Sequence, residues 1–100
     1  MPSKIYTIWL NETAYLVVDV QAHGGTMIDF VVRLVHVRDG IDVDVARYDT
    51  AHGLPHRDLV SPDGRLRQKD WLEGLCSNDA LTFAIDDFKE NYEEYIHNQT

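Results

Sequence analysis

Residues 48–58 gather the side chains of this chain that are best suited to chemistry. They read Tyr-Asp-Thr-Ala-His-Gly-Leu-Pro-His-Arg-Asp, so two of the five histidines stand among an arginine and two aspartates. Imidazole exchanges a proton near neutral pH, and a guanidinium stabilises developing negative charge. His52 and His56 could therefore act as an acid–base pair on a phosphodiester, with Arg57 contacting the phosphate.

The same residues admit two other interpretations. His52, His56 and Asp58 could form part of a zinc or other transition-metal site, because such metals bind imidazole and carboxylate groups. Alternatively, both histidines only hydrogen-bond the loop backbone, while Gly53 and Pro55 set its turn. The chain has no phosphate-binding glycine motif, no nucleophile elbow and no cysteine cluster. We predict no cofactor and no metal.

Length and composition favour a single globular domain over residues 1–100, with 44% hydrophobic and 26% charged residues. The net charge of −8 repels nucleic-acid backbones, which disfavours RNA as a partner. Cys76 is the only cysteine, so we expect a buried thiol and a cytoplasmic location. We expect no signal peptide and no membrane helix, because no apolar run approaches roughly 18 residues.

Four strand-like runs precede His52 and His56, at residues 4–10, 13–22, 26–38 and 41–49. Asp-Gly at 39–40 is a strong signal for a two-residue hairpin turn between the last two runs. Ile41, Val43 and Val45 alternate with Asp42 and Asp44. We therefore expect the three apolar residues inside and the two aspartates outside.

The hairpin register also predicts where the end of the fourth strand points. An unbroken two-residue turn sets Arg47 opposite Val32 and Asp49 opposite Phe30, on the core side. Charged groups there are costly unless they are paired or hydrated. We expect the following loop to return to the same corner. The predicted cluster contains His52, His56, Arg47 and Asp49, although a simple ion pair between Arg47 and Asp49 would also satisfy this corner.

The rest of the chain predicts a short hairpin and one helix. Residues 58–60 and 65–68 flank a Pro-Asp-Gly turn, and the basic residues nearby suit a sheet edge protected by charge. From about Asp79 to Ile96, apolar residues recur at helical spacing, with Ser77 or Asn78 as the cap and Phe88 deeply buried. We expect an α+β fold, a mostly antiparallel β-meander of about five to six strands with one C-terminal helix packed across the sheet.

The sequence of residues 48–58, with Pro-Asp-Gly at 62–64 and Leu-Thr-Phe-Ala-Ile-Asp-Asp at 81–87, resembles a known family. It is a family of short bacterial and archaeal proteins of unknown function that carry a Tyr-Asp-x-Ala-His-Gly-x-Pro-His loop. The resemblance covers roughly residues 28–97. More distantly, the chain is similar to the TumE-type toxins of toxin–antitoxin pairs, which carry a comparable Pro-His-x-His signature near mid-chain. This family usually has His where the present chain has Asp58. The resemblance implies a similar fold and no established activity.

Two functions are therefore expected. The first is a toxin-like protein that acts on RNA phosphodiesters, with an antitoxin-like partner. The second is a non-catalytic protein-binding or assembly module with a structural histidine loop, whose acidic helix face meets a basic protein or which associates with itself. No membrane partner is expected. The predicted site residues are His52 and His56 as catalytic groups, and Arg47, Asp49, Arg57 and Asp58 as binding groups.

Overall fold

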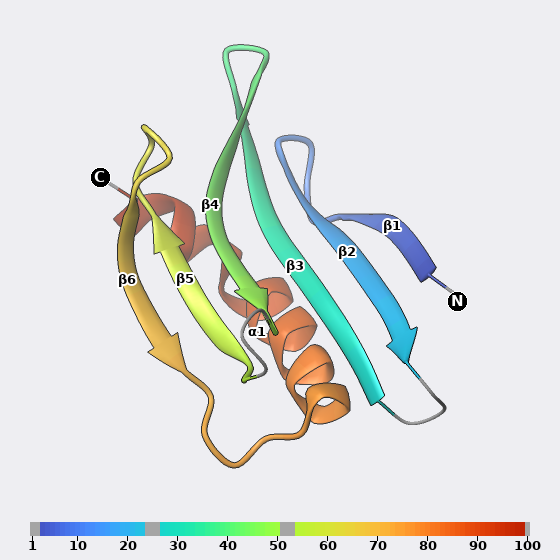
Figure 1. Cartoon of the computed structure of the whole chain (residues 1–100). Helices are drawn as coiled ribbons and strands as arrows, with labels where there is room; N and C mark the ends of the chain where they lie inside the picture. Colours follow the sequence, from blue (N-terminus) through green and yellow to red (C-terminus); the bar gives the residue numbers. More distant parts are fainter. Residues whose placement is uncertain (1–2, 24–26, 51–53, 100) are drawn as a thin grey trace.

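A computed structural model describes residues 3–23, 27–50 and 54–99. Figure 1 shows one twisted sheet with a single helix behind it. The strands are β1 (Ser3–Trp9), β2 (Ala14–His23), β3 (Met27–Arg38), β4 (Ile41–Asp49), β5 (His56–Val60) and β6 (Leu66–Trp71), and helix α1 spans Ser77–Asn98. All neighbouring strands are antiparallel and follow sequence order. The predicted α+β meander with a C-terminal helix is confirmed.

The predicted tight turn between β3 and β4 is present. Asp39 and Gly40 both have positive φ, at 52° and 76°, as a type I′ turn requires. The pairing then departs from the predicted register. Val35 pairs with Asp44, whereas Leu34 pairs with Ala46, so Val45 is an extra residue in a β-bulge.

The bulge reverses the facing of the end of β4. Tyr48, rather than Arg47, lies opposite Val32, and Asp49 lies opposite Val31. Because side chains alternate along a strand, Tyr48 faces the helix while Arg47 and Asp49 face the other side. The prediction that Arg47 and Asp49 point to the core side was wrong, because a single extra residue exchanges the two faces.

Burial along the hairpin partly follows the predicted alternation. Val45 is buried and Asp42 and Asp44 are exposed, as predicted. Ile41 is 65% exposed and Val43 is half-buried, contrary to prediction. The reason is visible in Figure 1, where the tip of the β3–β4 hairpin projects past the end of the region that α1 covers.

The core lies between α1 and one face of the sheet. Phe88 is fully buried, as predicted, and its ring centroid lies 5.0 Å from that of Tyr48. Ala80 and Ala84 precede Phe88 at four-residue intervals and are also fully buried. Their small side chains let α1 approach the sheet closely. The buried cluster consists of Leu16, Val18, Phe30, Val32, Leu34, Val45, Ala46, Tyr48, Ala80, Ala84 and Phe88.

The start of α1 differs from the prediction. Cys76 is the N-cap residue and makes no side-chain capping hydrogen bond, so Ser77 and Asn78 lie inside the helix rather than at its cap. Cys76 is exposed, and the expectation of a buried thiol was wrong, because the residue precedes the first turn of the helix. No helix within the described ranges combines the length and the apolar content of a membrane span.

The end of α1 is tied to the sheet by Gln99. The Gln99 Nε2 group donates to the backbone carbonyls of Asp44 and Val60, each at 2.8 Å. The helix continues to Asn98, two residues beyond the predicted end at Ile96. The opposite face of the sheet, called here the open face, carries no other described element (Figure 1).

Candidate functional site

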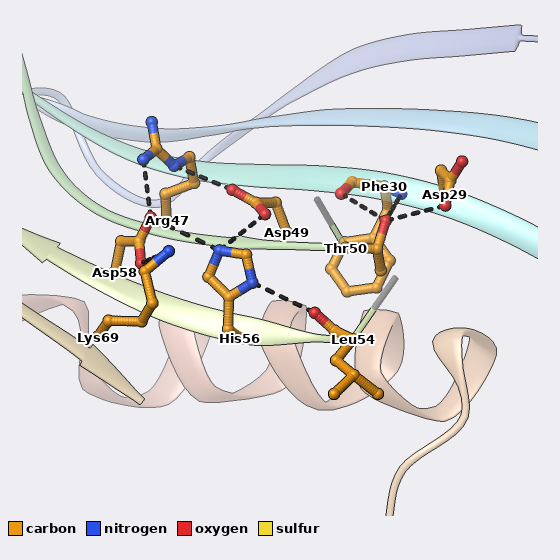
Figure 2. A network of polar contacts seen from close by, with 9 residues as sticks. All are labelled: Asp29, Phe30, Arg47, Asp49, Thr50, Leu54, His56, Asp58 and Lys69. Atoms are coloured by element: carbon orange, nitrogen blue, oxygen red, sulfur yellow. Dashed lines mark hydrogen bonds and ion pairs between the residues drawn. The ribbon is translucent and has the colours of Figure 1, made fainter. Parts of the chain in front are cut away.

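The pairing of β4 with β5 builds a cluster of charged side chains on the open face. Arg47 lies opposite Asp58 and Asp49 lies opposite His56. Asp58 also pairs with Lys69 of β6, the other strand next to β5. Figure 2 shows these side chains converging from the strands. We call Arg47, Asp49, His56, Asp58 and Lys69 the polar cluster.

His56 is at the centre of the polar cluster and is only 1% exposed. Its Nε2 atom lies 2.9 Å from Asp49 Oδ1 and 3.6 Å from Asp58 Oδ2. Its Nδ1 atom lies 3.2 Å from the carbonyl oxygen of Leu54. Both ring nitrogens therefore face oxygen acceptors. A neutral imidazole has only one N–H donor, so the tautomer decides which of the two nitrogens donates.

The two aspartates of the cluster are also contacted by cations. Arg47 Nη2 donates to Asp58 Oδ2 at 2.8 Å, and Arg47 Nε lies 3.1 Å from Asp49 Oδ2. Lys69 Nζ lies 3.5 Å from Asp58 Oδ1. Burial alone would raise the pKa of Asp58, but the hydrogen bond from Arg47 and the charges of His56 and Lys69 outweigh it and lower that pKa below its ordinary value.

The neighbouring backbone fixes both ends of the connection that joins β4 to β5. Thr50 Oγ1 accepts a hydrogen bond from the Phe30 N–H at 3.0 Å and lies 3.2 Å from Asp29 Oδ1. Figure 2 shows this contact beside the polar cluster. At the other end, the Pro55 carbonyl accepts from the Leu72 N–H at 2.9 Å. These contacts hold the last residue of β4 and the first residue of β5 in register.

Three residues of the polar cluster carry groups that bind metal ions. Asp49, His56 and Asp58 offer ligand atoms that all lie within 4.8 Å of one another, and all three residues are buried. Imidazole with carboxylates suits several divalent metals. However, Arg47 contacts both carboxylates and Lys69 contacts one, so a divalent ion would lie against two fixed positive charges. The donor set therefore fits an ion-pair network better than a metal centre.

The structure brings together some of the predicted site residues and separates others. Arg47, Asp49 and His56 lie in one cluster, as predicted, although on the open face. Arg57 points to the opposite face, where it contacts Asp70 and the hydroxyl of Tyr95. His52 lies outside the described residues, so its place in the cluster stays a prediction.

Two residues of the site were missed by sequence reasoning. Lys69 contacts Asp58, and the Trp71 ring lies 5.0 Å from the His56 ring. Both are in β6, directly opposite the residues that they contact. The sequence signal for this pairing was the Pro-Asp-Gly turn at 62–64. A bulge between Leu59 and Val60 shifts the pairing of β5 with β6, so the turn alone does not give the partners of Lys69 and Trp71.

One family model matches residues 1–99, and its description is "Domain of unknown function (DUF7718)". This match agrees with the expected resemblance to a family of unknown function. The similarity to TumE-type toxins and the specific loop motif stay expectations. Comparison with curated proteins and comparison with solved structures gave no match.

Proposed function

We propose that this chain, which belongs to the DUF7718 family of domains of unknown function, is a non-catalytic protein-binding module that receives its partner along β1. The observation that carries the proposal is the exposure of two large apolar side chains on this edge strand. Ile5 is 69% exposed and Trp9 is 60% exposed. An edge strand offers unpaired backbone groups, and exposed apolar side chains beside them favour the addition of a partner strand.

The other edge of the sheet supports this choice by contrast. β6 contains Arg67 and Lys69 and follows Arg65, whereas β1 contains Lys4 as its single charged residue. Charged residues on an edge strand hinder pairing with another chain. β6 also exposes two apolar side chains, Leu66 at 55% and Trp71 at 46%, so the edges differ in charge rather than in apolar exposure. The lower charge of β1 supports it as the edge that receives the partner.

The apolar surface continues from β1 onto the open face. Ile5 and Trp9 lie on this face, because Trp9 is paired with Tyr15 and their ring centroids are 4.7 Å apart. Val17 and Val31 are half-buried on the same face. A solvated face of an antiparallel sheet usually has polar residues at such positions. This surface, defined as Ile5, Trp9, Tyr15, Val17 and Val31, is called the β1 patch.

Charge selects the class of partner. The chain has a net charge of −8, and Asp19 lies between Ile5 and Val31 in the register. Arg33, which also faces this side, is engaged by Asp44 at 2.7 Å. We therefore propose a partner protein with an extended apolar segment flanked by lysine or arginine, because complementary charge favours association and suppresses wrong partners.

In this proposal the polar cluster is structural. His56 is buried and both of its ring nitrogens have acceptors within the protein. A general acid or base must reach the reacting atom of its substrate. The cluster instead joins β4, β5 and β6 across the open face, which stabilises the end of the sheet opposite to β1.

A toxin-like reaction on RNA phosphodiesters is the second candidate, and one observation favours it. Arg47, Asp49, His56 and Asp58 converge in a buried cluster, and such groupings of titratable residues are frequent at functional sites. This reaction would require the cluster to open, since His56 is inaccessible. It would also proceed without Arg57, which lies on the other face of the sheet.

The first experiment follows backbone NMR signals of the full chain during titration with a synthetic peptide of consecutive valines flanked by lysines. Shift changes should map to β1 and β2. The double variant Ile5→Glu/Trp9→Glu should weaken binding by about tenfold or more, whereas Leu66→Glu in β6, also at an exposed apolar residue, should not. Shift changes confined to α1, or equal weakening by both variants, would contradict the proposal.

Two further measurements separate the alternatives. Light scattering should show a monomer at the concentrations of the titration. A dimer that dissociates in the Ile5→Glu/Trp9→Glu variant would identify a second copy of the chain as the occupant of the β1 patch instead. RNA should stay intact when incubated with the purified chain. Cleavage that is lost in a folded His56→Ala variant would favour the toxin-like reaction and reject the structural role of the polar cluster.

A further inference from the structure

We infer that a pocket between the C-terminal half of α1 and the β5–β6 hairpin binds a small zwitterion of the amino-acid class, through its carboxylate and its ammonium group. The pocket has a volume of about 340 Å³. It lies on the helix-covered side of the sheet, because Leu59 and Tyr95 from its lining also pack against the core. It is thus separate from the polar cluster and from the β1 patch, and the inference does not depend on the proposed protein partner.

The two walls of the pocket carry opposite charges. The sheet side contributes Arg57, Leu59 and Arg67, and the helix side contributes Asp87, Asn91, Glu94, Tyr95 and Asn98. The helix residues recur at intervals of three and four, which places them on one face of α1. This polar face of α1 lies beside its apolar face, which packs against the core. The polar face is therefore directed toward β5 and β6.

The inner part of the pocket is fixed by hydrogen bonds within the protein. Asp87 Oδ2 accepts from the Tyr48 hydroxyl at 2.7 Å and from the Tyr95 hydroxyl, and Asp87 Oδ1 accepts from Asn91 at 2.8 Å. Arg57 donates to the Tyr95 hydroxyl at 2.9 Å and to Asp70 at 2.5 Å. These groups are held in place before any ligand arrives, which lowers the cost of ordering a site on binding.

Charged groups that remain available lie on opposite walls. Arg67 donates through Nη1 to the Asn98 carbonyl at 3.0 Å, which leaves its other N–H groups for a ligand. Glu94 has no hydrogen-bond or ion-pair partner within the described part of the chain. A ligand that carries both a carboxylate and an ammonium group would contact Arg67 with the first and Glu94 with the second.

Charge balance and size narrow the ligand class. Arg57 and Arg67 offset Asp87 and Glu94, so the lining has no net charge and gives no preference to a simple anion or cation. A molecule with one charge of each sign suits this arrangement. The volume is near the small end of ligand pockets, which run from about 300 to 1,000 Å³. A single amino acid fits this volume better than a nucleotide does.

The test uses the full chain and the twenty free L-amino acids, each supplied singly, with binding measured by saturation-transfer NMR and by backbone shift changes. At least one amino acid should bind and shift signals of α1 residues 91–98. Its N-acetyl form lacks the ammonium group and its amide form lacks the carboxylate, so each should bind at least about tenfold more weakly.

Matched variants locate the binding. Arg67→Gln and Glu94→Gln should each weaken binding by about tenfold or more, and a retained amide spectrum will show that both are folded. Arg65→Gln and Glu93→Gln change exposed neighbours outside the pocket and should leave binding unchanged. Absence of binding by every amino acid to the wild-type chain, equal binding of the N-acetyl form, or equal weakening in the control variants would overturn the inference.

Discussion

His56 Nε2 lies 2.9 Å from Asp49 Oδ1, and the two residues face each other directly across β5 and β4. Both are buried, and the other ring nitrogen of His56 lies 3.2 Å from the Leu54 carbonyl. A buried polar group that loses its partner costs more than the bond itself contributed. The contact therefore gives a direct way to distinguish a structural histidine from a catalytic one.

Replacement of this histidine should destabilise the fold. His56→Ala should lower the free energy of unfolding by about 1–3 kcal/mol, because Asp49 Oδ1 loses its contact with the imidazole and Trp71 loses its ring contact. Urea unfolding followed by circular dichroism measures the loss. His97→Ala, at an exposed position of α1, should change it by no more than about 0.5 kcal/mol. A similarly small effect of His56→Ala would point to a functional residue instead.

Acid should weaken the same region through Asp58. Burial opposes ionisation, but Arg47, His56 and Lys69 lower the pKa of Asp58 below its ordinary value. A carboxyl group whose pKa is lowered by folding contributes stability above its unfolded pKa of about 3.9, and that stability is lost as pH falls through the folded pKa.

Asp58→Asn should therefore be less stable than the wild type at neutral pH, and the difference should shrink as pH falls below about 4. Urea unfolding at a series of pH values measures it. Asp42→Asn, at an exposed position of β4, is the control and should show little difference at any pH. A difference for Asp58→Asn that stays constant with pH would mean that the loss comes from packing and not from charge.

The helix stripe gives a prediction for the core. Phe88→Ala should cost about 3–5 kcal/mol, because the side chain is fully buried against Tyr48 and Tyr95. Phe83→Ala is the matched control on the same helix, and it should cost clearly less because Phe83 is 47% exposed. Equal losses in urea unfolding would mean that Phe83 is buried by a partner or a second copy.

Features that local sequence determines were predictable, and features that tertiary packing determines were not. The Asp39-Gly40 turn is local, and the apolar spacing around Phe88 is periodic, so both were predictable. The bulge at Val45 is not local, because it depends on how both Val45 and Ala46 fit against α1. The sequence carries one sign of it, because the apolar residues stand at 41, 43 and 45 and then at 46 and 48, whereas Arg47 and Asp49 are charged.

The candidate site also combines features that the local sequence predicts with features that depend on tertiary packing. The strand end at Arg47 and Asp49 and the return at His56 were enough to predict that these residues gather. The face on which they gather depends on the bulge and was predicted wrongly. Arg57 was assigned to the site from proximity in sequence, but adjacent residues of a strand point to opposite faces. Pairing with β6, which adds Lys69, depends on a second bulge.

Alkaline pH should test the buried hydroxyl contacts beneath the helix. The Tyr48 hydroxyl donates to Asp87 at 2.7 Å. Burial raises the pKa of Tyr48 far above its ordinary value, and the hydrogen bond to Asp87 raises it further. A tyrosine whose pKa is raised by folding contributes stability that is complete below its unfolded pKa of about 10 and is lost as pH rises through the folded pKa.

Tyr48→Phe should lower the free energy of unfolding at neutral pH by about 1.5–3 kcal/mol, because a hydrogen bond to the charged carboxylate of Asp87 is lost. Above about pH 10 the wild type should lose stability more steeply than the variant, since only the wild type must keep this phenol protonated. Tyr6→Phe, at a half-buried position of β1, is the control and should follow the wild-type slope. Parallel slopes for wild type and Tyr48→Phe would contradict the raised pKa and would leave the neutral-pH loss to packing alone.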